Sequence, residues 1–549
     1  WSEDRSSNAL AFANPTGLAF DGEVYNRPEL CRQLELPADT PLENLLLAGS
    51  KRWSPSGLMQ RLDGVFALAV RDGDGLLLYR DPSGLRNLYG YTGRSGRMAF
   101  ATHLDTLLNL PGVDRLLSHR SLHEYLRFLD IAAPNTLFEG VVAPEPGKLL
   151  HWSARGMELR HCGSPEDIGT APRSFLDAVD WIDKHLQESV RARLENVRRP
   201  AAFLSGGIDS ALLCAMAAHH RHDTTAVTVG FEGSAYDEAP VAQRIAAHLQ
   251  MKHEILRFSR RDYLSAFNRL SQHMEQPMAD PATPATVLAF DQCRDRFDAV
   301  LDGTGADEAV GMLPPRHVRV AVEWASLLPR SVRSGLTRML NSAPSLADFA
   351  PLFNFEHPAD TMIRWSGFTR LEIESLCGEP VSFQHTHFYQ TFRRYPRRAH
   401  FERFSALLNA MPCDRLNQSM LVSGANVRYP FCQAETDRFI RQLPTHHRYL
   451  PGQPKRVLRT LLTRYVPVSL WDLPKHGFSF PLNAFLVADG CRLVRHHLDA
   501  ARWRQSGVLS HAKVENYARQ FMAGDHRLTF RVWALVVLGA WLEKHDQFR

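Results

Sequence analysis

The sequence predicts a protein of the α/β class whose N-terminal part is α+β. Up to about residue 155, short apolar runs alternate with Gly- and Asp-containing turns, which is typical of packed antiparallel sheets. From residue 175 onward, strand and helix patterns alternate, which predicts a parallel sheet covered by helices. Residues 156–174 are polar and contain Gly, Ser and Pro, so we expect a linker between the domains 1–155 and 175–549.

Composition restricts the class of protein. The chain has 549 residues, too many for one hydrophobic core, and its net charge of +5 is mild for that length. It has no uncharged apolar run of about 18 residues, the length that a membrane span needs. The eight cysteines are scattered without a CxxC pair, which argues against a structural zinc site and fits a reducing compartment. We therefore expect a cytoplasmic protein that binds neither nucleic acid nor membrane.

The N-terminal region is expected to contain short strands and turns. In Leu18–Tyr25, a short apolar run is broken by Asp21-Gly22, which predicts a hairpin turn. Further apolar runs bounded by Gly and Asp predict strands, and one longer run predicts a helix. The strands are expected at 65–70, 76–79, 98–101 and 148–152, and the helix at 122–129.

A long amphipathic helix is expected after the linker, over residues 175–197. Strand and helix patterns then alternate, and beyond about residue 316 the pattern becomes mainly helical. In parallel sheets of this kind, ligands bind at the carboxyl ends of the strands. The strands are expected at 201–204, 225–231, 253–258 and 299–302, and the helices between them at 209–219 and 238–248.

The stretch Ser205-Gly-Gly-Ile-Asp-Ser210 follows the first of these strands. Two adjacent glycines let the backbone approach a phosphate, and the free N–H groups at a helix start favour an anion. Ser205 and Ser210 add hydroxyl donors. Asp209 would repel phosphate unless a divalent cation bridges the two, so its presence favours a metal–phosphate site. The alternative for this stretch alone is an ordinary strand–turn–helix connection.

A second stretch, Leu301-Asp-Gly-Thr-Gly-Ala-Asp-Glu308, repeats the order of strand, glycine turn and carboxylate. Asp209 and Asp307 at the ends of two strands could hold one or two Mg²⁺ ions against a triphosphate. Taken separately, each Asp is more often a turn or capping residue. Together, the two loops favour the metal site.

A lysine could supply positive charge to a reacting phosphate. Lys475 lies between Pro and Gly in an apolar loop, which favours a fixed position for its ammonium group. The alternative is an exposed loop lysine. Lys455 and Arg456, just before a predicted helix, are weaker candidates for the same role.

In this order, the motifs resemble those of asparagine-synthetase-like enzymes. The resemblance covers about 175–545 and extends into the N-terminal region, and several motifs in order are more specific than any one alone. The synthetase-type motifs are Ser205–Ser210, Tyr236–Pro240, Ile245–Leu249, Glu275–Pro281, Gly303–Glu308, Val427–Phe431 and Pro474–Phe478. The N-terminal motifs are Asp21–Asn26, Leu62–Ala67, Arg80–Gly84 and Thr136–Gly140.

The resemblance implies a fold for each domain and a role for each motif. Residues 1–155 would form a degenerate glutamine amidotransferase-like domain, a glutaminase-like β-sandwich of the Ntn type. Residues 175–549 would form an adenine-nucleotide α-hydrolase-like (PP-loop) adenylating domain with a helical C-terminal part. The implied catalytic residues are Lys475, Asp209 and Asp307, the last two as Mg²⁺ ligands. The implied ATP- or pyrophosphate-binding residues are Leu204, Ser205, Gly206, Gly207, Asp209, Ser210, Val229, Phe231, Gly303, Gly305 and Lys455, with Val229 and Phe231 near the adenine.

The implied reaction has two steps. A carboxylate attacks the α-phosphate of ATP and gives an acyl-adenylate and pyrophosphate. An amine then attacks the acyl group and gives an amide and AMP. ATP and Mg²⁺ are therefore the expected cofactors.

Departures from the family pattern bear on the amine. Glutamine-hydrolysing members begin with a catalytic cysteine, whereas this chain begins at Trp1 and lacks the arginine segment expected ahead of Asp21. Cys31 lies in a predicted helix and is expected to pack in the core. Thr304 stands where asparagine-forming members carry an acidic residue that accepts a proton, and Asp302 stands where relatives commonly have Ser. We have no account of Asp302 from the sequence.

These departures favour an amine other than ammonia from glutamine. Our hypothesis is a lasso peptide macrolactam synthetase, which adenylates a precursor Asp or Glu side chain and joins it to the N-terminal amine. Its expected partners are a precursor peptide, a leader peptidase and a leader-binding protein. The alternatives are a small-molecule β-lactam or amide synthetase, an ammonia-dependent asparagine synthetase-like enzyme, an inactive scaffold, and a tRNA-modifying ATPase with the same loop.

Overall fold

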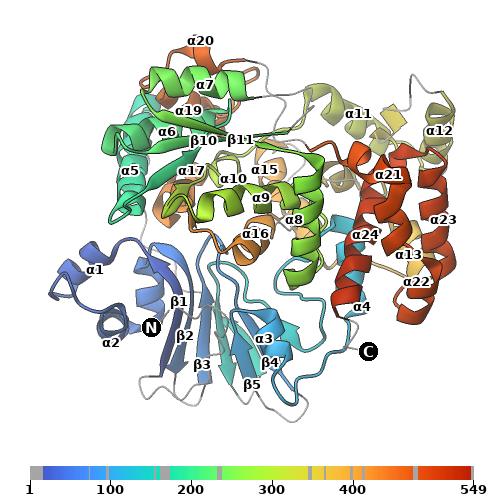
Figure 1. Ribbon diagram of the computed structural model, residues 1–549, viewed down its shortest axis with the longest axis horizontal. Coiled ribbons are helices and arrows are strands. Elements are labelled where there is room, and N and C mark those ends of the chain that lie inside the picture. Colours follow the sequence, from blue (N-terminus) through green and yellow to red (C-terminus); the bar gives the residue numbers. More distant parts are fainter. Residues whose placement is uncertain are drawn as a thin grey trace.

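The protein is described by a computed structural model that shows two domains and a helical C-terminal part (Figure 1). The first domain (blue) lies against the parallel-sheet domain (green), and the C-terminal helices (red) pack beside both. The described residues are 17–72, 75–93, 98–153, 156–160, 174–231, 238–343, 346, 349–350, 352–363, 367–395, 400–410, 414–473 and 480–545.

The first domain contains two antiparallel sheets that pack face to face. Ala67, Leu78 and Trp152 of the larger sheet are buried between them, against Phe100 of the smaller sheet. The larger sheet has the order β1 (Leu18–Val24), β2 (Gly64–Asp72), β3 (Gly75–Arg80), β7 (Leu149–Ser153), β8 (Gly156–Arg160). The smaller has the order β5 (Met98–Ala101), β4 (Tyr89–Thr92), β6 (Val141–Val142). The predicted sandwich of antiparallel strands is confirmed.

Helices pack against both sheets of this sandwich. They are α1 (Arg27–Gln33), α2 (Leu42–Arg61), α3 (Leu104–Leu108) and α4 (His119–Phe128). Cys31 on α1 is 2% exposed and packs with Leu30 and Leu45, so its predicted place in the core is confirmed. The helix expected over 122–129 is also confirmed, since α4 begins three residues earlier and is capped by the Ser118 side chain.

Two predictions for this region are corrected. Asp21-Gly22 is no hairpin turn, because β1 continues through it in register with β2. Gly22 has φ +131, and a Cβ there would lie 2.1 Å from the carbonyl oxygen of Val65, so glycine serves the close approach of two strands. Residues 156–160, expected in the linker, form β8 and pair with β7, so the first domain extends to Arg160.

The second domain is built on the predicted parallel sheet. Its order is β11 (Lys252–Phe258), β10 (Thr225–Phe231), β9 (Pro200–Phe203), β12 (Ala299–Leu301), β13 (Val427–Arg428), and every pair is parallel. After β9, the chain adds β10 and β11 on one side of that strand, and it then crosses back to add β12 on the other side. The carboxyl ends of β9 and β12 therefore meet where the strand order reverses, which is the usual ligand position in such sheets.

Alternation along the strands buries both faces of this sheet. On one face, Ala202 and Ala226 pack in a core with residues of α5 (Phe175–Leu194), α6 (Ile208–His220) and α7 (Ala239–His248). On the other face, Ala201 and Val227 pack in a second core. The helices around the sheet are α5 (Phe175–Leu194), α6 (Ile208–His220), α7 (Ala239–His248), α8 (Arg260–His273), α9 (Thr283–Arg294) and α10 (Ala306–Val310). The helix predicted over 175–197 is confirmed as α5, whose first turn is capped by Ser174.

The rest of the described chain is mainly helical, as expected. Helix α24 is buried along most of its length and contributes Trp533 and Trp541 to the largest core. Among the described residues, no helix is both long and apolar enough to cross a membrane. The remaining helices begin with α11 (Arg316–Ser326), α12 (Arg330–Ser342), η2 (Pro358–Met362), α13 (Arg370–Cys377), α14 (His387–Arg394) and α15 (His400–Ala410). They continue with α16 (Arg415–Ser423), η3 (Pro430–Cys432), α17 (Ala434–Gln442), α18 (Thr445–Arg448), α19 (Arg456–Leu462) and α20 (Val468–Trp471). They end with α21 (Leu482–His497), α22 (Ala500–Ser506), α23 (His511–Met522), η4 (His526–Leu528) and α24 (Thr529–Lys544).

Two arginines of the second domain hold the first domain in place. Arg193 on α5 is 2% exposed and forms a two-pronged ion pair with Asp63, with Nη2–Oδ1 and Nη1–Oδ2 distances of 2.9 and 3.1 Å. Arg428 on β13 donates to both carboxylate oxygens of Glu23 at 3.0 and 3.2 Å. Both guanidinium groups lie near the ring of Tyr25, at 4.4 and 5.5 Å. We call Tyr25, Arg193 and Arg428, with Asp63 and Glu23, the arginine clamp.

Removing one partner of this clamp is expected to destabilise the protein strongly. In Asp63→Ala, the buried Arg193 loses its counter-ion, which should cost about 3–5 kcal/mol of unfolding free energy. The control is Asp180→Ala, because Asp180 is 64% exposed in its ion pair with Arg464 and its loss should cost at most about 1 kcal/mol. Urea unfolding measures both, and equal losses would contradict a dominant role for the clamp.

A second contact between the domains joins a histidine to a buried carboxylate. His103 Nδ1 lies 3.4 Å from Oε1 of the buried Glu275. The hydrogen bond to Glu275 raises the pKa of His103 above its ordinary value of 6.5, although burial opposes it. A raised folded-state pKa means that the stabilisation is complete below pH 6.5 and is lost as the pH rises through the raised value.

We therefore expect the wild type to lose stability as the pH rises from 6.5 through the raised pKa of His103. The His103→Asn variant should lack this part of the pH dependence, because its amide does not titrate. Unfolding curves at several pH values between about 5.5 and 8.5 measure the difference. Parallel pH profiles of the two proteins would contradict the assignment to His103.

Candidate functional site

The first predicted loop lies at the carboxyl end of β9 and leads into α6. The hydroxyls of Ser205 and Ser210 are 2.9 Å apart, and the Ser205 N–H donates to Ser210 Oγ at 3.1 Å. The Gly207 N–H donates to Ser205 Oγ at 3.2 Å. These bonds close the loop into a fixed curve at the start of α6, where the helix dipole favours an anion. Leu204, also predicted for this site, is buried below the loop.

The second loop approaches the first very closely. A Cβ at Gly303 would lie 3.2 Å from Asp209 Cβ and 3.3 Å from the Ser210 nitrogen. Gly305 has φ +101, and a Cβ there would lie 2.8 Å from the sulfur of Cys432. Glycine therefore relieves tight packing at Gly303, and at Gly305 it serves both a close contact and a left-handed backbone.

Lys455 joins the two predicted carboxylates. Its Nζ forms a short ion pair with Asp209 Oδ2 and lies 2.8 Å from Asp307 Oδ1. Burial lowers the pKa of Lys455, but the charges of Asp209 and Asp307 outweigh burial and raise it above its ordinary value. The residue stands just before α19 with φ +56, a conformation that a lysine rarely adopts. Of the two lysines predicted for this role, the weaker candidate thus meets both carboxylates.

The remaining predicted residues are placed as follows. Lys475 lies outside the described residues. Val229 is on β10, beside the strand that carries the first loop, and packs partly buried against the core. Phe231 ends β10, and its side chain also lies outside the description. Gly206 follows the end of β9, where a Cβ would lie 3.1 Å from Val241 Cγ1.

The donor set fits a magnesium ion. Asp209 and Asp307 both reach one ammonium group, so their carboxylates are close enough to share a cation. Carboxylate oxygens are the ligands that Mg²⁺ takes, usually together with substrate phosphates. The bonded serine hydroxyls and the start of α6 supply the adjacent phosphate-binding surface.

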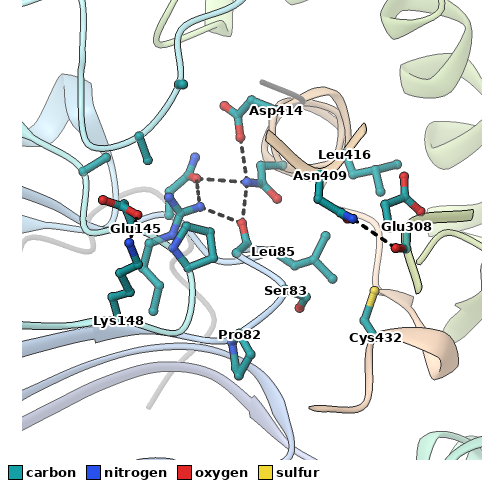
Figure 2. A pocket seen from close by; sticks show the side chains of 18 of the residues that line it. Pro82, Ser83, Leu85, Glu145, Lys148, Glu308, Asn409, Asp414, Leu416 and Cys432 are labelled. Carbon is teal, nitrogen blue, oxygen red and sulfur yellow. Dashed lines mark hydrogen bonds and ion pairs between the residues drawn. The ribbon is translucent and has the colours of Figure 1, made fainter. Parts of the chain in front are cut away.

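A cavity of about 590 Å³ lies beside this site, between the two domains (Figure 2). Thr304, Gly305 and Glu308 line it on one side, and Arg80 and Ser83 of the first domain line it on the other. Further lining residues include Pro82, Leu85, Glu145, Lys148, Asn409, Asp414, Leu416, Asn417 and Cys432. The cavity therefore leads from the domain junction to the second glycine loop.

Polar contacts hold the walls of this cavity. Asn417 donates to Asp414 at 2.6 Å and to the Gly84 carbonyl at 2.8 Å, which connects α16 to the first domain. Arg80 also donates to the Gly84 carbonyl, at 2.6 Å. Sequence reasoning missed these lining residues, although Arg80–Gly84 stood out as a motif, because only the folded chain brings them opposite Glu308.

Gly305 offers a test of the close packing at the site. In Gly305→Ala the new methyl group would collide with Cys432 in a left-handed backbone, so we expect a lower melting temperature and weaker nucleotide binding. The control is Gly424→Ala, which has φ +66 but whose nearest contact would be Arg294 Cδ at 3.8 Å. It should cost only the left-handed strain of about 1–2 kcal/mol and leave ATP affinity unchanged. Equal effects of the two changes on ATP affinity would contradict the assignment.

Sequence comparisons match both domains. The asparagine synthase family matches residues 182–543, and the glutamine amidotransferase domain family matches residues 9–162. A putative glutamine-hydrolyzing asparagine synthetase of Mycobacterium tuberculosis is 26% identical over 559 residues, covering 95% of this chain and 84% of that protein. The glutamine-hydrolyzing asparagine synthetase 1 of Bacillus subtilis is 26% identical over 329 residues, covering 59% of this chain and 51% of that protein.

Proposed function

The chain belongs to the asparagine synthase family and is an asparagine synthetase-like ATP-dependent amide ligase, and we propose that it joins a peptide carboxylate to a peptide amine. The observation that carries the proposal is the Asp209–Lys455–Asp307 cluster, whose Asp307 precedes Glu308 in the cavity lining. In this proposal the cluster activates the carboxylate with ATP, and the cavity admits the amine.

In the first step, the substrate carboxylate attacks the α-phosphate of ATP, and pyrophosphate leaves. The N–H groups at the start of α6, with Ser205 and Ser210, would bind the departing phosphates. Asp209 and Asp307 would hold Mg²⁺, which supplies Lewis-acid neutralisation of the phosphate charge when bound. Lys455 sits between them and adds a fixed positive charge where negative charge develops.

In the second step, an amine attacks the acyl carbon and AMP leaves. The cavity volume of about 590 Å³ lies in the range of pockets that enclose whole organic ligands, roughly 300–1,000 Å³. Such a volume supports an amine that carries a substituent, such as the N-terminus of a peptide. Its lining is mixed in charge, with Arg80, Lys148, Glu145 and Glu308, which suits a polar peptide segment.

Macrolactam formation in lasso peptide biosynthesis is the best form of this proposal. There, the side chain of a precursor Asp or Glu is joined to the N-terminal amine of the same peptide. The natural partners would then be the precursor peptide, a leader peptidase and a leader-binding protein. A small-molecule amide or β-lactam synthetase is the second candidate, because the same cavity would admit its substrate.

Ammonia released from glutamine is the competing source of the amine, as the names of the curated relatives indicate for those proteins. The structure describes residues 17–153 apart from 73–74 and 94–97, and the cysteine among these described residues is Cys31. Cys31 is buried in a hydrophobic core and does not line the cavity. In that part of the domain, no cysteine lines the cavity.

Substituting either carboxylate of the cluster is expected to impair the first step, the adenylation. Asp209→Asn and Asp307→Asn should each lower ATP–pyrophosphate exchange at least about 10²-fold, because each removes a carboxylate that would hold Mg²⁺ against the phosphates. Excess EDTA should abolish the exchange of the wild type, and added Mg²⁺ should restore it. Asp180→Asn, an exposed acidic residue on α5, is the control and should exchange normally. Full exchange by both site variants would refute the role of the cluster.

The product decides the substrate class. The protein, ATP and Mg²⁺ are incubated with synthetic peptides that have a free N-terminus and an internal Asp or Glu, with aspartate plus ammonium, and with glutamine. Peptide cyclisation appears in mass spectrometry as the loss of one water, with one AMP formed per ring. Asparagine formation, or glutamate release from glutamine, would overturn the peptide proposal in favour of an asparagine synthetase activity.

A further inference from the structure

Asp302 and Thr304 form a hydrogen-bonded pair within the second glycine loop. Thr304 Oγ1 donates to Asp302 Oδ1 at 2.6 Å, and the Thr304 N–H donates to the same oxygen at 2.8 Å. The backbone of Asp302 is anchored in turn, since its N–H donates to the Arg428 carbonyl at 3.0 Å. The carboxylate is therefore held in a fixed position against the threonine hydroxyl, and Asp302 is not among the residues that line the cavity.

Thr304 lies between the cavity and the phosphate-binding loop. It lines the interdomain cavity together with Gly305 and Glu308. Its neighbour Gly303 is packed against Asp209 and the Ser210 nitrogen. A nucleophile that crosses the cavity toward an acyl group held at the first loop would therefore pass the Thr304 side chain.

On the basis of the proposed ligase function, we infer that Thr304 and Asp302 accept the proton of the attacking amine as a relay. As the amine nitrogen bonds to the acyl carbon, the carbon–oxygen bond to AMP breaks and AMP leaves with that electron pair. One N–H proton of the amine passes to Thr304 Oγ1, and the proton of the hydroxyl passes to Asp302. Thr304 would be a catalytic residue that touches substrate, and Asp302 a positioning residue that acts through it.

The chemistry of the pair supports this direction of transfer. Because the hydroxyl hydrogen of Thr304 points at Asp302, its oxygen lone pairs remain to accept a hydrogen bond from an amine. A hydroxyl alone is too weak a base near neutral pH, but one that is bonded to a carboxylate can pass its proton on. The same pairing explains why an acidic residue two positions before the threonine is useful.

The neighbouring carboxylates are already engaged in other contacts. Asp307 is paired with Lys455, and Glu308 Oε2 accepts the Gly305 N–H at 3.1 Å. Asp414, across the cavity, accepts from Asn417 at 2.6 Å and from Gln418 at 2.9 Å. Glu308 nevertheless lines the same cavity wall as Thr304, so it is the competing base that the experiment must distinguish from Asp302.

A short threonine also leaves space that a longer acidic side chain at the same position would fill. With the carboxylate withdrawn behind it, the cavity wall offers a small hydroxyl to the incoming group. This arrangement suits a primary amine with a bulky substituent, in keeping with a peptide N-terminus. The short threonine would thus serve two purposes, because it passes on the proton and leaves room for a bulky amine.

The test separates the two steps of the reaction. Thr304→Val, Thr304→Ser, Asp302→Asn and Asp302→Glu are assayed with the carboxylate substrate that supports ATP–pyrophosphate exchange in the wild type. We expect exchange within about twofold of wild type in all four, because adenylation does not need the relay. Amide formation should fall at least about 10²-fold in Thr304→Val and Asp302→Asn, whereas Thr304→Ser should keep most of it and Asp302→Glu part of it.

Hydroxylamine provides a readout that a purely structural role would not produce. It is a strong nucleophile that needs little help from a base, so hydroxamate should form at wild-type rates in Thr304→Val and Asp302→Asn. The matched control is Asp262→Asn, which removes a carboxylate bonded to a hydroxyl, Ser259, at 2.7 Å on the exposed start of α8. This control should leave both steps unchanged.

Each outcome decides the question. Normal amide formation by Asp302→Asn would overturn the relay and leave the ligase proposal intact. Loss of exchange in the same variant would show a structural role and overturn it as well. Loss of amide in Glu308→Gln, with Asp302→Asn unaffected, would assign the proton to Glu308. If the wild type exchanged with no carboxylate, the proposed function itself would fail, and the relay with it.

Discussion

The contact of one ammonium group with two carboxylates organises the candidate site. Lys455 precedes α19, Asp209 lies in the first turn of α6 and Asp307 in the first turn of α10, so one side chain joins three helices far apart in sequence. Without that charge, two carboxylates at the edge of the sheet would repel each other at close range. The contact also costs a left-handed backbone at Lys455, which persists because the surrounding packing over-determines it. Glycine at 303 allows the close approach to Asp209, and glycine at 305 allows the close approach to Cys432.

The cavity depends on a second constraint, the arginine clamp. Its walls come from both domains, and Arg193 and Arg428 help to fix the position of one domain against the other by holding Asp63, Glu23 and Tyr25. Asn417 also connects the two domains, because its side chain donates a hydrogen bond to the Gly84 carbonyl. The first domain thus shapes the approach to the second domain's site, whatever chemistry it performs itself.

The sequence predicted the sheet of the second domain well, because each strand there is an apolar run with glycine or polar residues at its end. β10 matches the expected 225–231 residue for residue. Predictions failed where the pairing of a strand with its neighbour, near or far in the chain, decides the structure. Gly22 looks like a turn residue until Val65 is placed 2.1 Å from its missing Cβ, and β8 looks like a linker until β7 pairs with it. In the site, the motifs identified Asp209 and Asp307, but neither spacing nor composition could tell which lysine lies between them. Asp302 had no account until its bonds to Thr304 were seen.

The arginine clamp also limits how such a chain can be recombined. Tyr25 receives a guanidinium group from α5 and another from β13, and each of these has its own acidic partner in the first domain. A first domain transplanted from a relative without this tyrosine and both acids would leave two arginines desolvated and uncompensated. The two halves are therefore not freely exchangeable modules. A functional chimera would have to exchange the first domain together with the residues of the second domain that contact it. The segment that must be exchanged is therefore larger than either domain.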